Sequence, residues 1–368
     1  MKAADRRLSI AILGTRGVPA RYGGFETFAA ELSTRLAERG HDVTVYCRGQ
    51  AIGHAWWGAV RTITLPALRH KYFETVSHTL LSALDVVFRE VDIVLLCNAA
   101  NAFVLPLLRA RRIPVATNVD GIERKRRKWN AMGKAVYAIG ESFSDAFSTR
   151  VIADAAVIAD YYSERFQSRP AVIAYGSELP REPESAILDE LGLRKRGYIL
   201  YVSRFEPENN PLEVITAYRK VRTQLPLVMV GEARYAPELR GEMTEAADER
   251  VIMPGAIYGE GYRTLQRHAL AYIQATEVGG THPALVEAMG SGGLVLAHDT
   301  PENREVGGDA VLYFDLRPVE TLSAALEKVL EATADQEALR IRSRARAASL
   351  YSWSLVTDAY EHLFRQLV

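Results

Sequence analysis

The sequence predicts an α/β protein made of two doubly wound, Rossmann-like domains. Three observations lead to this prediction. The chain has 368 residues, which is long for one typical domain and sufficient for two. Short apolar runs alternate with stretches of helical spacing, as in parallel sheets covered by helices. The alternation begins at residue 8, pauses in a connection that contains Pro180 and Pro183, and begins again at residue 198.

The first domain opens with a predicted buried strand at residues 8–13, followed by glycines and a helix. Apolar residues from Phe25 to Leu36 recur at helical spacing, and Gly40 ends the helix. Further strands are expected at residues 43–46, 60–65, 93–97, 114–119, 151–153 and 171–174. Further helices are expected at residues 73–89, 102–109, 133–148 and 160–166.

The second domain repeats the alternation. Strands are expected at residues 198–203, 227–230, 251–253, 271–274, 294–297 and 311–314, and helices at 211–221 and 236–246. Helical patterns fill residues 319–368, and we expect the last helix, 354–364, to return to the first domain. The predicted division is residues 1–176, a linker 177–196, residues 197–350, and a C-terminal helix 351–368.

The composition is that of a globular protein without a membrane-spanning segment. Hydrophobic residues make up 48% and charged residues 24%, as in a globular protein with a sizeable core. No apolar run approaches the ~20 residues that span a bilayer, and the N-terminus lacks the apolar core of a signal peptide. Cys47 and Cys97 are expected to be buried thiols in a reducing cytoplasm. We therefore expect a soluble cytoplasmic protein.

Charge differs between the two halves of the chain. Residues 1–180 carry 24 Lys and Arg against 17 Asp and Glu, whereas residues 181–368 carry 21 against 28. A basic first half could face an anionic partner, and compositional drift explains the difference equally simply. No nucleic-acid partner is expected.

The stretch EVGGTHPALVEAMGSGGLVLA, residues 277–297, is the strongest candidate for a binding site. Pro283 suits the first position of a helix, and glycines precede it, so the unpaired N–H groups of the helix start on an open backbone. Such an end attracts phosphate. Glu287, one turn further in, could accept hydrogen bonds from sugar hydroxyls. A plain connection between helix and strand is the alternative interpretation.

The glycines after the first strand do not form the G-x-G-x-x-G pattern of dinucleotide-binding proteins. Their order is GTRG at residues 14–17, followed by Gly23 and Gly24. A dehydrogenase would also need an acidic residue after the second strand, where Cys47 and Arg48 stand. We therefore discount a nicotinamide cofactor.

Residues 118–129 place a carboxylate and a run of cations after another strand. Asp120 follows the strand at 114–119, where it suits either chemistry or the capping of a turn. The cations could lie against anionic lipid headgroups or an acceptor's phosphates, or form a solvated loop. The run consists of Arg124, Lys125, Arg126, Arg127 and Lys128, and it ends at Trp129.

Four segments together carry a resemblance to a known enzyme family. They are GTRGVPARYGGFET (residues 14–27), NVDGIERKRRKWN (118–130), SRFEPENNP (203–211) and EVGGTHPALVEAM (277–289). Over nearly its whole length the chain resembles retaining glycosyltransferases of the GT-B fold, and most of all the rhamnosyltransferase branch that builds bacterial surface polysaccharides. The resemblance implies two domains facing across a cleft. It also implies a hexosyltransferase that moves a sugar, with dTDP-rhamnose as a candidate donor, to a lipid-linked or saccharide acceptor.

The resemblance also implies roles for individual residues of the donor site. Glu287 matches the second glutamate of the family's E-x7-E motif, which holds the ribose of the donor. Gly279 stands at the first glutamate, and Glu277 lies two positions too early to replace it directly. Arg204 matches an arginine that holds the pyrophosphate.

Further positions follow from the same resemblance. Asn209 replaces the usual lysine five residues after the arginine, and Asp120 stands where many relatives have a histidine beside the sugar. The backbone positions implied to approach the donor or its diphosphate are Gly23, Gly24, Gly280 and Thr281.

These residues predict a mechanism without a metal ion or cofactor. Breaking the bond between the anomeric carbon and the diphosphate places negative charge on the departing phosphate, and Arg204 with helix N-terminal amides would neutralise it. We find no D-x-D motif and no metal-ligand spacing. Asp120, Arg204 and Glu287 are the candidate catalytic residues. A nucleotide-sugar epimerase, a glycogen-synthase-like enzyme and a non-catalytic nucleotide-sugar-binding protein remain the alternatives.

Overall fold

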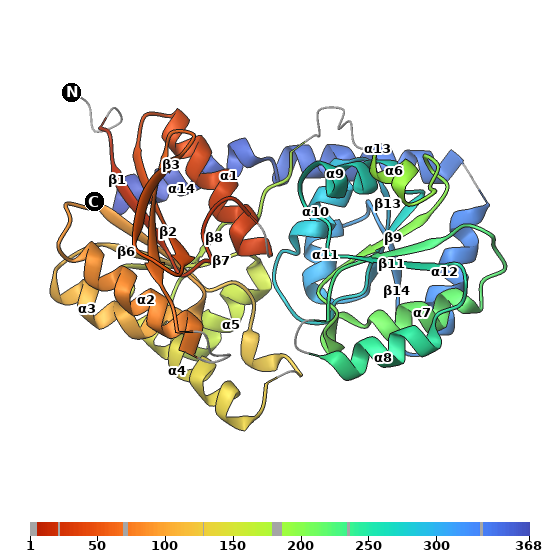
Figure 1. The fold of residues 1–368 in the computed structure, drawn as a ribbon, viewed down its shortest axis with the longest axis horizontal. Helices are drawn as coiled ribbons and strands as arrows, with labels where there is room; N and C mark the ends of the chain where they lie inside the picture. The colour runs from red at the N-terminus through yellow and green to blue at the C-terminus, as the bar shows by residue number, and fades with distance from the viewer. Residues whose placement is uncertain are drawn as a thin grey trace. The chain divides into compact units, whose positions relative to one another are not determined.

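The computed structural model describes residues 6–20, 23–68, 73–127, 129–178, 186–233, 236–331 and 334–368. The chain divides into two compact units (Figure 1). The first unit contains Met1–Lys125, Trp129–Tyr175 and Trp353–Val368, and the second contains Arg126–Lys128 and Gly176–Ser352. Each unit holds one sheet with helices packed against it.

The first unit is organised by an eight-stranded sheet. Its order is β3-β4-β2-β1-β5-β6-β7-β8, and every neighbouring pair is parallel except β3 with β4. Strand β2 lies on one side of β1 and strand β5 lies on the other. The strand order therefore reverses between β1 and β5. The strands are β1 Ser9–Leu13, β2 Asp42–Gly49, β3 Gly53–Trp57, β4 Val60–Pro66, β5 Ile93–Cys97, β6 Val115–Asn118, β7 Arg150–Ala153 and β8 Ala171–Val172.

Alternate residues of these strands supply two hydrophobic cores, one on each face of the sheet. Ile10 and Ile12 pack with helices α1 (Gly24–Glu38) and α14 (Trp353–Leu367). Ala11 and Leu13 pack with helices α2 (Phe73–Val86) and α3 (Leu105–Ala110). The remaining helical segments of this unit are η2 Ala99–Val104, η3 Glu123–Lys125, α4 Ala131–Phe147 and α5 Ala156–Phe166.

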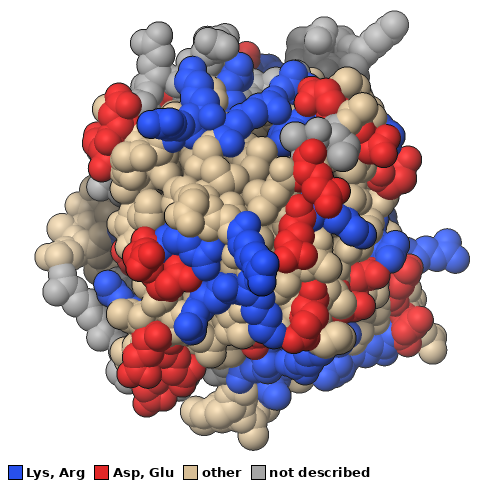
Figure 2. All heavy atoms as spheres, turned by 90° about the vertical axis from the view of Figure 1, so that its right-hand side faces the viewer, with Lys and Arg blue, Asp and Glu red and all other residues tan. Residues whose placement is uncertain are grey.

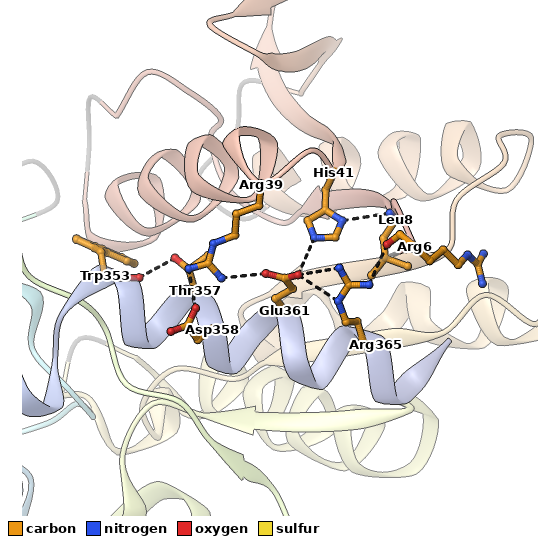
Figure 3. Close-up of polar contacts among 9 residues, drawn as sticks. All are labelled: Arg6, Leu8, Arg39, His41, Trp353, Thr357, Asp358, Glu361 and Arg365. Carbon is orange, nitrogen blue, oxygen red and sulfur yellow. Dashed lines mark hydrogen bonds and ion pairs between the residues drawn. The ribbon is translucent and has the colours of Figure 1, made fainter. Parts of the chain in front are cut away.

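The C-terminal helix α14 returns to the first unit, as the sequence predicts. Tyr360 and Phe364 are fully buried in the same core as α1. A polar cluster holds the outer side of the helix, with Glu361 at its centre (Figure 3). Glu361 accepts hydrogen bonds from Arg39 at 2.9 Å and from Arg365 at 2.8 Å, and it lies 3.3 Å from His41.

Replacing Glu361 by glutamine is expected to weaken the docking of α14 in a pH-dependent way. Burial by itself would raise the pKa of Glu361, but hydrogen bonds from Arg39, Arg365 and His41 outweigh burial and lower the pKa from 4.5 to about 2. The ionised carboxylate therefore contributes stability above pH ~4.5, and this contribution is lost as the pH falls toward 2. Because solvent screens the cluster, we expect a loss of about 1 kcal/mol at pH 7.

Urea unfolding of the Glu361→Gln variant, measured from pH 7 down to pH 3, tests this expectation. The difference from the wild-type protein should shrink as the solution becomes more acidic. The same change at the exposed Glu38 serves as the control and should have little effect at either pH. A difference that stays constant over this range would contradict the assignment.

The second unit contains a fully parallel six-stranded sheet in the order β11-β10-β9-β12-β13-β14. In this sheet the strand order reverses between β9 and β12. The strands are β9 Ile199–Val202, β10 Leu227–Val230, β11 Val251–Gly255, β12 Ala271–Gln274, β13 Leu294–His298 and β14 Leu312–Phe314. The helical segments are η4 Pro207–Asn209, α6 Ile187–Glu190, α7 Pro211–Arg219, α8 Pro237–Ala246, α9 Gly259–His268, α10 Pro283–Gly290, α11 Pro301–Gly307, α12 Glu320–Leu330 and α13 Ala334–Leu350.

Several elements were not predicted from the sequence, among them strand β3 and helices α9 and α11. Strand β3 is an antiparallel edge strand, and α9 is a polar helix that begins at a glycine. Cys47 and Cys97 are buried and free, as expected. Within the described residues, no helix combines the length and the apolar character needed to cross a membrane.

Candidate functional site

The candidate site of the second unit lies at the point between β9 and β12 where the strand order of its sheet reverses. Open α/β sheets bind ligands at this point, beyond the carboxyl ends of the strands. Residues 203–210 follow β9, and residues 275–282 follow β12, which pairs with β9. Hydrogen bonds join the two loops, because Glu277 N donates to Glu208 O at 2.9 Å and Asn210 Nδ2 donates to Ala275 O at 2.8 Å. The loop that carries Arg204 and Asn209 is therefore hydrogen-bonded to the loop that carries Glu277 and the glycines before α10.

The start of helix α10 presents backbone rather than side chains. Pro283 is the first residue of the helix, and the N-cap residue His282 makes no side-chain capping hydrogen bond. Gly279 and Gly280 are buried. A Cβ atom at Gly279 would lie 2.3 Å from Cε1 of His282, so a larger side chain there requires the imidazole to move. The absence of a glutamate at position 279 is thus coupled to the position of His282.

His282 is a neutral imidazole at physiological pH. Burial, with a smaller contribution from the positive charge of Arg126, lowers its pKa to about 3. A neutral ring beside a helix start can donate one hydrogen bond and accept another without adding charge.

Glu287 is held in place by a tyrosine that sequence reasoning missed. Tyr262, on α9, donates its hydroxyl hydrogen to Oε2 of Glu287. Gln266 Nε2 donates to the same tyrosine oxygen at 2.9 Å. Burial and the negative charge of Glu287 raise the pKa of Tyr262 well above its ordinary value, so the tyrosine keeps its proton. Since this carboxylate belongs to α10, the chain Gln266–Tyr262–Glu287 fixes an acceptor of hydrogen bonds close to the start of that helix.

Arg204 follows β9 directly, and its side chain is 43% exposed, with Glu206 Oε1 at 3.7 Å from Nη1. The backbone of the loop is fixed beneath it. Asn209 Nδ2 donates to Arg204 O at 2.7 Å, and Tyr201 Oη donates to Asn209 O at 2.7 Å. The Asn209 side chain thus holds the loop that presents Arg204.

Glu277 lies between two arginines instead of standing at the start of α10. Its carboxylate is 3.3 Å from Arg127 Nη2 and 3.7 Å from Arg317 Nη2. Arg127 Nη2 also donates to the backbone oxygen of Pro207 at 2.5 Å.

The basic run at residues 124–128 does not form one exposed surface. Arg126 is buried, with Nη1 3.6 Å from Oε1 of the fully buried Glu208. Arg124 donates to the hydroxyl of Tyr161 at 2.6 Å, and Lys125 is exposed. The prediction that the run contacts lipid headgroups or an acceptor is therefore wrong for Arg126, because this residue is buried beside the carboxylate of Glu208. Lys128 lies outside the described residues.

Trp129, which ends the run, is half-buried. Its Nε1 donates to Glu123 Oε2 at 3.3 Å, and its ring lies 5.2 Å from that of Tyr137 on α4. It therefore packs within the first unit.

Asp120 lies at the carboxyl end of β6 in the first unit. Its backbone has a φ of 57°, a left-handed conformation that aspartate tolerates better than most residues. The backbone N–H donates to Asn118 Oδ1 at 2.9 Å, and Tyr175 Oη donates to the Asp120 carboxylate at 3.2 Å. The half-buried carboxylate is thus fixed at a strand end where ligands of this fold class bind.

The glycine-rich loop after β1 reaches the same edge of the first unit. Gly14 has a φ of 90°, and a Cβ atom there would lie 2.3 Å from the backbone oxygen of Cys97 at the end of β5. Gly23 is the N-cap of α1, which begins at Gly24. Glu26, which the sequence did not single out, is buried and accepts a hydrogen bond from Arg16 N at 2.9 Å. This bond ties the loop to the helix start.

A cavity of about 500 Å³ lies elsewhere in the first unit. It is lined at the amino ends of β1, β2 and β4 by residues that include Ser9, Asp42 and Arg61. None of the predicted site residues contributes to it. Because ligands of doubly wound sheets bind at the carboxyl ends, we place the candidate site there and not in this cavity. In the described parts of the chain, no group of three or more His, Cys, Asp or Glu side chains is arranged to hold a metal ion.

Comparisons with known families divide the chain at nearly the same place as the fold. Residues 7–178 match a domain of unknown function (DUF1972). Residues 185–347 match the family described as glycosyl transferases group 1. The segment that matches this family contains Arg204, Asn209, Tyr262, the glycines before α10, and Glu287.

Solved structures show the same fold over the whole chain. Sucrose-phosphate synthase from Thermosynechococcus elongatus is similar with a TM-score of 0.83 and 18% identity, covering 98% of this chain and 99% of its own. HepE from Anabaena in complex with UDP-glucose has a TM-score of 0.77 and 15% identity, covering 97% and 99%. A trehalose-phosphate synthase from Burkholderia xenovorans in complex with glucose-6-phosphate has a TM-score of 0.77 and 11% identity, covering 97% and 100%. No curated protein matches in sequence. The chain therefore has the GT-B fold that the resemblance implies.

Proposed function

We propose that the chain is a retaining glycosyltransferase that moves a sugar from a nucleotide-sugar to a lipid-linked or saccharide acceptor without a metal ion. The observation that carries the proposal is the Tyr262–Glu287 pair beside the glycine-lined start of α10. A fixed carboxylate accepts hydrogen bonds from ribose hydroxyls, and the adjacent helix start binds phosphate. The match of residues 185–347 to glycosyl transferases group 1 supports the same assignment.

In the proposed mechanism, the bond between the anomeric carbon and the diphosphate breaks as the acceptor oxygen bonds to that carbon. The acceptor's proton passes to the leaving phosphate. Negative charge develops on the diphosphate, where the Arg204 guanidinium and the N–H groups of Gly280 and Thr281 stabilise it. Asp120 orients sugar hydroxyls from the first unit.

The donor base and sugar are proposed from two sources. The resemblance to rhamnosyltransferases makes dTDP-rhamnose the first donor to test. HepE, which shares the fold, is described in complexes with UDP and with UDP-glucose, so uridine nucleotides form the second group.

A thermal-shift screen against UDP, dTDP, GDP and ADP, followed by product analysis with a labelled nucleotide-sugar, tests this function. A nucleoside diphosphate at 100 times its Kd should stabilise the protein by about 2.7 kcal/mol. The labelled sugar should appear in a glycoside. An isomerised nucleotide-sugar without a glycoside would instead show an epimerase, and a protein that no nucleotide stabilises would contradict the proposal.

Activity is expected to persist in the presence of a chelator. The positive charge that offsets the leaving diphosphate comes from Arg204 and backbone amides in the proposed mechanism, so EDTA should leave kcat unchanged. The measurement is the transfer rate with EDTA, and with added Mg²⁺ as its counterpart. A rate that falls with EDTA and returns with Mg²⁺ would show that a cation shares this role.

A further inference from the structure

Helix α2 exposes four large apolar side chains and buries three polar ones, although Ala83 and Val86 of the same helix lie in the core. His78, Thr79 and Ser82 are fully buried. Val76, Leu80, Leu81 and Leu84 are 38–43% exposed, and Phe88, just past the helix, is 85% exposed. A helix at a water-facing surface normally shows the reverse pattern.

Hydrogen bonds fix this orientation of α2. His78 Nε2 lies 3.0 Å from the backbone oxygen of Cys47, and Thr79 Oγ1 donates to Asn101 Oδ1 at 2.8 Å. Rotating the helix to hide its leucines would break these buried bonds, each of which costs about 1–3 kcal/mol when a group is left unpaired. Buried hydrogen bonds on the opposite side of α2 therefore keep its leucines exposed.

Helix α4 has the same inverted character. Met132, Val136 and Ile139 are 50–63% exposed, whereas Glu141 and Ser144 are buried. Gly140 faces inward so closely that a Cβ atom would lie 2.4 Å from the backbone oxygen of Ala99. Glu141 Oε2 accepts a hydrogen bond from Tyr161 Oη at 2.7 Å. A close backbone approach and a buried carboxylate thus hold α4 in place.

The two helices belong to one layer, since both pack on η2, and Figure 1 shows α2, α3 and α4 side by side on one side of the first sheet. The described residues expose seventeen large hydrophobic side chains, and eight of them lie on α2, α4 or just after α2. We call this surface the α2–α4 face. It consists of Val76, Leu80, Leu81, Leu84, Phe88, Met132, Val136 and Ile139.

Charges around the α2–α4 face favour an anionic partner. Two acidic groups of these helices are engaged inside the layer, because Asp85 accepts hydrogen bonds from Arg89 and Tyr46, and Glu141 is buried. Glu74 on α2 and Asp145 on α4 are half-buried. Exposed cations border the face, while Glu90 is an exposed acid beside it. These cations are Arg109, Arg111 and Arg112 at the end of α3 and Lys134 on α4. By contrast, Figure 2 shows acidic and basic side chains interspersed over the surface that it views.

We infer that the α2–α4 face docks onto an anionic phospholipid surface, with the aliphatic side chains among the acyl chains and the arginines against headgroup phosphates. Shallow insertion of an apolar helix face flanked by cations is how interfacial helices bind bilayers. A second copy of the chain fits less well, because a symmetric contact would bring the same cations of both copies together. This surface contains none of the residues proposed to bind the donor.

Vesicle sedimentation tests the inference with the whole protein. The probes are vesicles of phosphatidylcholine alone and of phosphatidylcholine mixed with phosphatidylglycerol. The protein should sediment with the mixed vesicles and much less with the neutral ones, and added salt should weaken the binding.

Matched variants distinguish vesicle binding through the α2–α4 face from nonspecific binding by exposed apolar side chains. Leu80→Gln with Leu84→Gln, or Val136→Gln with Ile139→Gln, should weaken binding to the mixed vesicles by about tenfold or more. Ile341→Gln on α13, which removes an apolar side chain that is 64% exposed in the second unit, should leave binding unchanged. Arg111→Gln with Arg112→Gln should reduce the preference for anionic lipid. All variants should keep the wild-type melting temperature, since the changed side chains are exposed.

Three outcomes would overturn the inference. The wild-type protein fails to sediment with either vesicle, or the face variants bind as well as Ile341→Gln, or ultracentrifugation shows a dimer that only the face variants dissociate while no vesicle binds. Because pure lipid vesicles contain no donor, these results are independent of the nucleotide thermal shift.

Discussion

Glu287→Ala is expected to lower kcat/KM for the nucleotide-sugar by about 10³-fold, because it removes the carboxylate proposed to bind ribose hydroxyls. A site built around a hydrogen bond to a hydroxyl loses far more than a methylene-sized contact when that bond is missing. The stabilisation of the protein by a nucleoside diphosphate should fall in parallel. Steady-state kinetics and thermal shift on the same samples measure both effects.

Two further variants show whether Glu287 acts at the ligand. Tyr262→Phe keeps the ring but removes the donor to Glu287 Oε2, and we expect a smaller loss of about tenfold from a less well oriented carboxylate. Glu260→Gln changes an exposed glutamate on α9 and should have no effect. Wild-type kinetics in Glu287→Ala would remove the ribose assignment.

Arg204→Ala is expected to cost about 2–4 kcal/mol of transition-state stabilisation, or roughly 10²–10³-fold in kcat, by analogy with the loss of one oxyanion donor. Asn209 and Tyr201 hold the backbone of the loop that carries Arg204, and we propose that its guanidinium reaches a diphosphate bound at the start of α10. The effect should fall on kcat more than on KM, since the charge it offsets develops in the transition state.

Arg204→Lys keeps the charge and should recover part of the rate, though not the two-point hydrogen bonding of a guanidinium. Arg263→Ala removes an exposed arginine of α9 and is the control for general loss of positive charge. An Arg204→Ala enzyme with an unchanged rate would show that other groups hold the diphosphate.

Much of the fold could be predicted from the sequence because its strands are short, apolar and bounded by turn residues. The strands at 93–97, 227–230 and 271–274 were predicted with their observed limits. Strand β3 was missed because it is an edge strand with no buried residue, which leaves no pattern of alternation to detect. Helix α9 was missed because it is polar and contains Gly259 and Gly261, both poor helix formers.

Side-chain partners far apart in the sequence could not be predicted. The glycine–proline start of α10 was visible as local chemistry, but the Tyr262–Glu287 bond arises only when α9 packs beside α10. The basic run had the composition of a solvated loop, yet Arg126 is buried against Glu208. Local patterns indicate which backbone is open to a ligand, whereas tertiary packing decides which charges remain available.

The most direct test of the donor site is a crystal structure of the protein with UDP or dTDP, whichever stabilises it more in the thermal-shift screen. We expect the diphosphate against the N–H groups of Gly280 and Thr281 and the guanidinium of Arg204, with the ribose hydroxyls on Glu287. A nucleotide that binds away from the carboxyl ends of β9 and β12, or that leaves Arg204 and Glu287 without contact, would contradict the assignment.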